Sequence, residues 1–151
     1  MNPIFVWSAL VISAIIIQTT ILVDFFVNGL KPDLLLIIVV LTSIILGKHH
    51  GVTIGFFSGL LEDLLTFFGL NTLVKMFIGF IFGSIEQQVF KEHKLLPLIA
   101  MSIATVLNYI LSLLFLLLLG VNINVNIAML YNLLLVLAYN VVIALFVHKL
   151  L

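Results

Sequence analysis

Long apolar runs separated by short polar breaks make up the whole chain. Residues 34–41 and 113–119 contain only apolar side chains, whereas a strand of an outer-membrane barrel alternates polar and apolar positions over ~10 residues. Several runs approach or exceed the ~20 residues with which a helix crosses a ~30 Å hydrocarbon core. The pattern therefore predicts transmembrane α-helices.

Charged residues, glycine, proline and asparagine divide these runs into separate predicted spans. The predicted spans are residues 3–23, 33–46, 51–68, 72–90, 95–119 and 127–147. The second is short for a spanning helix, so it requires a thinner bilayer, a partly buried end or a helix that extends further. The connections are short, which makes neighbouring helices antiparallel. We therefore expect an all-α integral membrane protein, a six-transmembrane-helix bundle that forms one domain over residues 1–151.

The composition agrees with burial in lipid and narrows the chemistry. Of the 151 residues, 64% are hydrophobic and 8% are charged, against roughly 25% charged residues in an ordinary globular domain. Cysteine is absent, which excludes disulfides and thiolate metal sites. The net charge is zero and arginine is absent, so the chain lacks the basic patch of a nucleic-acid-binding protein.

Lysine residues are distributed unevenly between the two faces of the predicted bundle. Six spans place both termini on one face, together with the second and fourth connections. That face carries four of the six lysines, namely Lys48, Lys91, Lys94 and Lys149. Short cytoplasmic loops are enriched in lysine and arginine. We therefore expect a multi-pass protein with both termini in the cytoplasm.

The third predicted span carries a stripe of small and polar residues. The residues that share this face, at about 100° per step, are Gly51, Gly55, Ser58 and Glu62, with Gly59 at the edge and Asp63 further round. Two overlapping G-x-x-x-G units allow a neighbouring helix to approach closely. The face is therefore a candidate surface for helix packing or for binding a partner's helix.

The fourth predicted span repeats this plan. Its shared face holds Thr72, Lys75, Gly79, Gly83 and Glu86. A tight turn at residues 69–71 would set Glu62 or Asp63 at the depth of Lys75, about 6 to 10 Å below the helix ends at ~1.5 Å per residue. An ion pair between the two helices is therefore predicted. The residues assigned to helix packing or partner binding are Gly51, Gly55, Gly59, Glu62, Asp63, Lys75, Gly79 and Gly83.

The adjacent acids Glu62 and Asp63 have three interpretations. It can be a salt bridge that fixes helix packing, a group that recognises a partner's helix or lines a small-molecule cavity, or a pair of carboxylates used in acid–base chemistry. Glu62 and Asp63 have no nucleophile, metal-ligand set or oxyanion hole beside them, and adjacent residues of a helix point about 100° apart. The salt bridge is the preferred interpretation, and no catalytic residue, metal site or cofactor is predicted.

Other polar side chains fit roles in packing between helices. Such residues in the last two predicted spans are Thr105, Asn108, Ser112, Asn132, Tyr139 and Asn140. Hydrogen bonds between membrane helices contribute roughly 0.6 to 2 kcal/mol each. His49 and His50 are adjacent in a predicted short loop without a third ligand, so an interfacial position is preferred over a metal or pH-sensing pair. Pro32 and Asp33 favour a helix start.

Four segments occur in an order that resembles a known family. They are QTT at residues 18–20, KPDLLLIIVV at residues 31–40, GVTIGFFSGLLEDLL at residues 51–65 and GLNTLVKMFIGFIFG at residues 69–83. Together they resemble the rod shape-determining protein MreD family. The order and spacing carry the resemblance, because each segment alone is short and largely apolar. Asp63 matches the family's Gly-Leu-Leu-x-Asp pattern.

The resemblance implies a non-enzymatic scaffold or regulator of the bacterial cell-elongation machinery in the inner (cytoplasmic) membrane. Proteins of that family bind the bitopic protein MreC and work with the actin-like MreB filament and the membrane glycosyltransferase and transpeptidase that build lateral peptidoglycan. Ala9 and Ser13 of the first predicted span offer a second small-residue surface for a partner's helix. A homodimer is one oligomeric state that the sequence leaves open.

An alternative function follows from the family's six-helix arrangement, which is similar to that of the substrate-binding subunits of energy-coupling-factor vitamin transporters. Such a subunit needs a polar cavity for its ligand. The candidates for lining that cavity are Asn108, Asn132, Asn140 and the Glu62/Asp63 pair. The short loops and the scarcity of aromatic residues beside these polar groups favour the scaffold over the transporter subunit.

Overall fold

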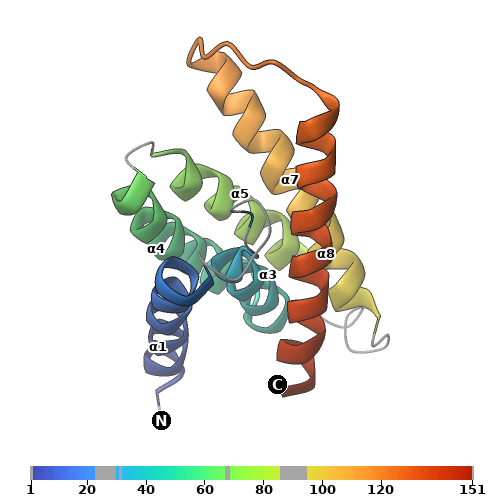
Figure 1. Ribbon diagram of the computed structural model, residues 1–151. Coiled ribbons are helices and arrows are strands. Elements are labelled where there is room, and N and C mark those ends of the chain that lie inside the picture. The colour runs from blue at the N-terminus through green and yellow to red at the C-terminus, as the bar shows by residue number, and fades with distance from the viewer. Residues whose placement is uncertain (1, 23–29, 31, 67–68, 86–94, 151) are drawn as a thin grey trace.

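Helices account for the regular structure throughout the part of the chain that the computed structural model describes, residues 2–22, 30, 32–66, 69–85 and 95–150 (Figure 1). The elements found there are α1 (Pro3–Ile16), the π-helix η1 (Ile17–Ile21), α3 (Leu34–Leu46), α4 (Lys48–Thr66), α5 (Leu70–Ser84), α7 (Leu96–Leu118) and α8 (Ile127–Leu150). No strand occurs in these ranges. The expectation of an all-α protein is confirmed.

The short helix α3 lies at the centre of the bundle. Nine of its 13 residues are buried, and it contacts α1, α4, α5, α7 and α8. A helix that is apolar all round is stable where other helices or lipid surround it, which explains why residues 34–41 have no polar face. The helix begins after Asp33 and ends at Leu46, and the next residue is Gly47, whose φ of 89° suits only glycine. The short second span is therefore an interior helix.

Helices α4 and α5 form the most closely packed pair, and glycine makes this packing possible. A Cβ atom built on Gly55 would lie 2.5 Å from the carbonyl oxygen of Lys75, and one on Gly51 would lie 2.7 Å from the carbonyl oxygen of Gly79. Side chains larger than hydrogen therefore do not fit between the two backbones. The glycine stripe of α4 faces α5 from within the same chain, and Gly79 and Gly83 complete the contact from the α5 side.

The boundaries of the third and fourth predicted spans differ from those in the structure. Helix α4 begins at Lys48 instead of residue 51, because the chain reverses at Gly47 and the N–H of Gly51 bonds to the Gly47 carbonyl at 3.0 Å. Helix α5 ends at Ser84 instead of residue 90, because the backbone of Ile85 is extended. The predicted stripe member Glu86 lies outside the described residues.

Helices α7 and α8 are long, apolar and exposed. Each has an apolar span of 23 residues. In the 18-residue apolar stretch of each helix, only 17% of the residues of α7 and 11% of those of α8 are buried. The core helix of a soluble protein would be mostly buried, so these faces require lipid. Figure 1 shows the α7–α8 hairpin extending beyond α5, with both chain termini at the opposite end of the bundle.

Candidate functional site

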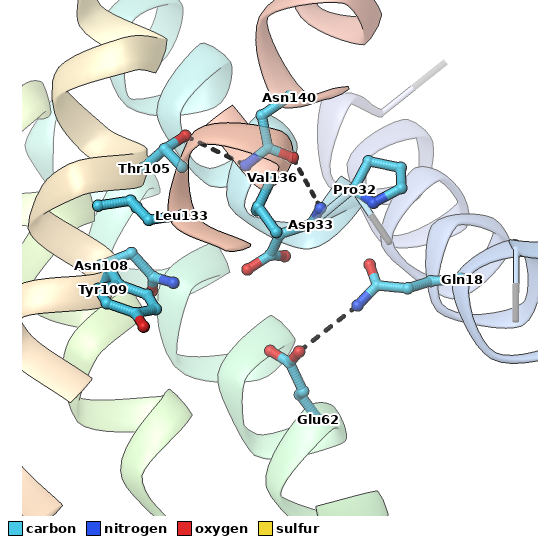
Figure 2. A pocket seen from close by; sticks show the side chains of 10 residues that line it. All are labelled: Gln18, Pro32, Asp33, Glu62, Thr105, Asn108, Tyr109, Leu133, Val136 and Asn140. Atoms are coloured by element: carbon cyan, nitrogen blue, oxygen red, sulfur yellow. Dashed lines mark hydrogen bonds between the residues drawn. The ribbon is translucent and has the colours of Figure 1, made fainter. Parts of the chain in front are cut away.

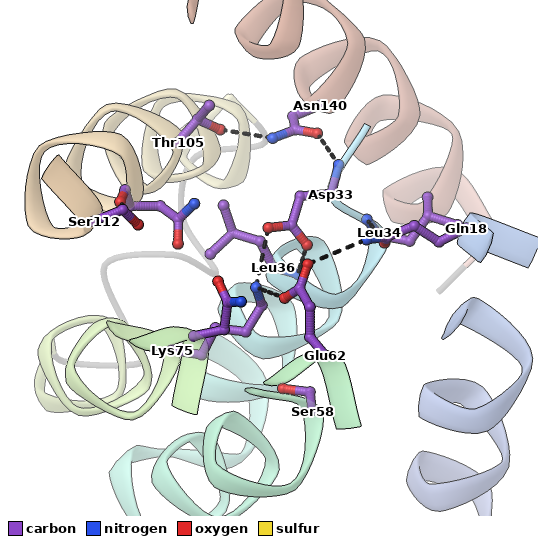
Figure 3. A network of polar contacts seen from close by, with 12 residues as sticks. Gln18, Asp33, Leu34, Leu36, Ser58, Glu62, Lys75, Thr105, Ser112 and Asn140 are labelled. Atoms are coloured by element: carbon purple, nitrogen blue, oxygen red, sulfur yellow. Dashed lines mark hydrogen bonds and ion pairs between the residues drawn. The ribbon is translucent and has the colours of Figure 1, made fainter. Parts of the chain in front are cut away.

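Lys75 of α5 is completely buried and pairs with two carboxylates. Its Nζ lies 2.5 Å from Oε2 of Glu62 and 3.1 Å from Oδ2 of Asp33 (Figure 3). The side chain of Lys75 is 0% exposed, whereas those of Asp33 and Glu62 are 15% and 19% exposed. The predicted ion pair between α4 and α5 is present, and Glu62 is the residue of α4 that makes it.

Asp33 brings α3 into this charge network. One carboxylate oxygen accepts the N–H of Leu36 at 2.9 Å and so caps α3, while the other pairs with Lys75. From the sequence, Asp33 was predicted only to favour a helix start, because the ion pair was derived from the α4–α5 hairpin alone. A usable signal existed, since Asp33 and Glu62 both fall toward the same face of the predicted bundle.

Gln18 joins the network from the π-helix η1. Its Oε1 accepts the N–H of Leu34 at 2.9 Å, and its Nε2 donates to Oε1 of Glu62 at 3.4 Å. The widened turn of a π-helix often occurs at functional positions. Gln18 is the only buried residue of η1. The side-chain amide of Gln18 therefore hydrogen-bonds both to the first residue of α3 and to Glu62 of α4.

Asn140 of α8 completes the arrangement from the far end of the sequence. Its Oδ1 accepts the N–H of Asp33 at 2.8 Å, and its Nδ2 donates to Oγ1 of Thr105 in α7 at 3.1 Å. The first N–H groups of a helix have no partner within the helix. At the start of α3, Asp33 caps its own helix, while Gln18 of η1 and Asn140 of α8 accept the N–H groups of Leu34 and Asp33, so two other helices are bonded directly to this N-terminus.

Asp63 has a different role from Glu62, although the two are adjacent. Its carboxylate accepts the N–H of Asn71 at 2.9 Å, the N–H of Thr72 at 2.8 Å and the hydroxyl of Thr72 at 2.5 Å. These groups form the start of α5, where a negative charge is favourable. The alternative prediction that Asp63 pairs with Lys75 is wrong, because the side chain turns toward the hairpin connection instead.

A cavity of about 200 Å³ lies beside the charge network (Figure 2). Its walls come from the N-terminal approach to α3 and from η1, α4, α7 and α8. The lining residues are Gln18, Pro32, Asp33, Glu62, Thr105, Asn108, Tyr109, Leu133, Val136 and Asn140. Of the polar candidates from the sequence, Asn108, Asn140 and Glu62 meet here, whereas Asn132 and Asp63 do not line it.

The histidine pair lies away from this network. His49 and His50 are exposed on the first turn of α4 and line an apolar groove of about 480 Å³ between α1 and α4. Nδ1 of His50 lies 3.2 Å from the carbonyl oxygen of Leu46. Within the described ranges, no group of three His, Cys, Asp or Glu side chains is placed to hold a metal ion.

The fold and this network define an all-helical membrane protein whose charged residues connect its helices internally. The chain belongs to the rod shape-determining protein MreD family, because the model of that family matches residues 1–151, the whole chain. The family resemblance inferred from the ordered segments is confirmed, and with it a role in determining rod shape. Comparison with curated proteins and comparison with solved structures each gave no significant match.

Proposed function

We propose that the protein is a non-enzymatic scaffold or regulator of the bacterial cell-elongation complex and that it binds an MreC-like bitopic protein. The observation that carries the proposal is the match of the rod shape-determining family model over residues 1–151, and the charge network, in which Lys75, Asp33 and Glu62 connect three helices, agrees with a structural role. Costly charged groups are used here to hold helices in register. Through its partner, the bundle would act on the MreB filament and the peptidoglycan synthases.

The proposed arrangement in the membrane is one domain of six spans in the bacterial inner (cytoplasmic) membrane, with both termini in the cytoplasm. The two termini share one end of the bundle in Figure 1, and Lys149 lies in the last turn of α8. Lysine near the ends of membrane helices favours the cytoplasmic side.

A topology reporter tests this orientation. A fluorescent protein that matures only in the cytoplasm should give a bright fusion after residue 151 and a dark fusion within residues 121–126, which connect α7 to α8. The lysine distribution predicts this pattern. Whole-cell fluorescence, normalised to the amount of fusion protein on an immunoblot, provides the measurement. The reverse pattern would overturn the proposed orientation.

The proposed surface for the partner is the exposed side of α1. Ala9 and Ser13 are four residues apart and both are exposed, which is the spacing of a small-xxx-small contact between membrane helices. The glycine stripe of α4 is a poorer candidate, because α5 already covers it at backbone distance. Helix α1 packs only on the α3 and α4 side among the contacts described.

Replacing Ala9 with leucine should reduce co-purification of the single-span partner by about tenfold, since filling a close helix contact destabilises it by roughly 1 to 3 kcal/mol. The matched control is Ala138→Leu, which enlarges an exposed alanine on α8. Pull-down from a mild detergent, with the partner quantified by mass spectrometry, gives the ratio. Full recovery of the partner with Ala9→Leu would place the interface elsewhere.

A transporter subunit is the second candidate, because the polar cavity brings together Asn108, Asn140 and Glu62. Its volume of about 200 Å³ is below the range of roughly 300 to 1,000 Å³ typical of small-molecule sites. A vitamin therefore fits less well than a smaller group. Mass spectrometry of a denatured extract distinguishes the two, since a stoichiometric vitamin would favour transport over the scaffold.

A further inference from the structure

We propose that the polar cavity beside the charge network binds one small, positively charged group of the ammonium type. This inference concerns a ligand site inside the bundle and goes beyond the proposed scaffold role. It holds whether or not α1 binds a partner.

The first argument is the balance of charge. The network contains one ammonium group and two carboxylates, which leaves a formal charge of −1. A net charge is unfavourable at membrane depth, where water does not screen it. An additional positive charge at this site would restore neutrality.

The second argument is the position of the charges. Lys75 is fully buried behind the two carboxylates and does not line the cavity, whereas Asp33 and Glu62 both do. None of the residues that line the cavity carries a positive charge. Figure 2 shows the two carboxylates near one another, with Asn108 and Tyr109 on another side of the space. The cavity therefore presents a negative wall.

The third argument is an acceptor without a donor. Asn108 lines the cavity, and its buried Oδ1 has no hydrogen-bond partner in the part of the chain that is described. Leaving such a group unpaired costs roughly 1 to 3 kcal/mol. A ligand that donates hydrogen bonds would satisfy this oxygen while its charge meets the carboxylates, and an ammonium group does both.

The size of the cavity selects among cations. A volume of about 200 Å³ corresponds to several waters at ~30 Å³ each, so a small organic ammonium group fits with some of its hydration. A tightly bound metal ion is disfavoured, because no group of three acidic, His or Cys ligands exists in the described ranges. The ammonium group can belong to a free amine or to a lysine side chain of a partner protein.

The test measures thermal unfolding of the purified chain in lipid nanodiscs with added methylammonium chloride. We expect the unfolding temperature to rise with methylammonium chloride. At equal ionic strength it should rise less with tetramethylammonium chloride, because that cation has no N–H donor. Glu62→Gln should weaken the apparent affinity for methylammonium by about tenfold, since it removes a charge-assisted contact. In that variant Lys75 retains its pair with Asp33.

Asp63→Asn is the matched control, because it removes the neighbouring carboxylate, which does not line the cavity. Its unfolding temperature should be lower throughout, with the methylammonium-dependent rise preserved. A rise in the chain alone that disappears in a complex with a single-span partner identifies the partner's lysine as the source, and a rise in both identifies a free amine. No rise in the chain alone, or an equal rise in Glu62→Gln, would overturn the proposal, as expected if a proton on one carboxylate balances the charge.

Discussion

Replacing Lys75 with methionine should destabilise the protein by about 3 to 5 kcal/mol, the range found when one partner of a buried ion pair is removed. Methionine keeps much of the volume of the fully buried lysine, so the change is chiefly electrostatic. Asp33 and Glu62 would face one another with no ammonium between them. Total stabilities of 5 to 15 kcal/mol are typical, which makes this loss large enough to reduce the amount of folded protein.

The measurement is the unfolding temperature in mild detergent, together with the yield of monodisperse protein. Lys149→Met is the control, because Lys149 is exposed in the last turn of α8. Adding Asp33→Asn and Glu62→Gln to Lys75→Met should recover much of the stability, since the uncompensated charges are then removed. If Lys75→Met alone unfolds at the same temperature as the parent chain, the ion pairs contribute nothing to the fold.

Replacing Gly55 with leucine should separate α4 from α5 and destabilise the bundle by about 3 kcal/mol, the upper part of the usual range for overpacking. The new side chain would meet the backbone of Lys75 and Met76, and a helix backbone cannot move aside as a side chain can. Since Lys75 is part of the charge network, the same substitution should displace its ammonium group from the carboxylates.

Spin labels report this separation directly, because the chain contains no cysteine of its own. Labels on cysteines introduced at the exposed positions Leu60 and Leu73, one on each helix of the hairpin, should show a longer and broader distance distribution in Gly55→Leu. Ala138→Leu adds the same side chain to an exposed site on α8 and should leave the distance unchanged. An unchanged distance in Gly55→Leu would mean that the close contact is not required.

The helical class and most helix positions could be predicted from the sequence, because length and uniform apolarity determine which segments enter lipid. The interior position of α3 could not be predicted, because an apolar helix has the same sequence pattern whether lipid or other helices surround it. The start of α4 was missed for a local reason. Lys48, His49 and His50 look like a polar loop, yet a single glycine at position 47 makes the turn.

The candidate site could be predicted only where its residues belong to one hairpin. The Glu62–Lys75 contact follows from helix periodicity and a short connection. The additional contact with Asp33 and the bond from Asn140 to the N-terminus of α3 join residues 42 and 107 positions apart. No local pattern encodes such distances. Asn108 and Asn132 likewise appear equivalent in the sequence, and only the packing of α7 and α8 places the first at the cavity.

The bond between Asn140 and the N–H of Asp33 has a consequence for biosynthesis. The two residues are separated by 107 positions, so α3 enters the membrane long before α8 is made. At synthesis rates of roughly 5 to 20 residues per second, this interval is about 5 to 20 s. During that time the start of α3 lacks one of its native partners. The completed bundle should therefore form only after the last helix leaves the ribosome, and a truncated chain without α8 should be a preferred substrate for membrane quality-control proteases.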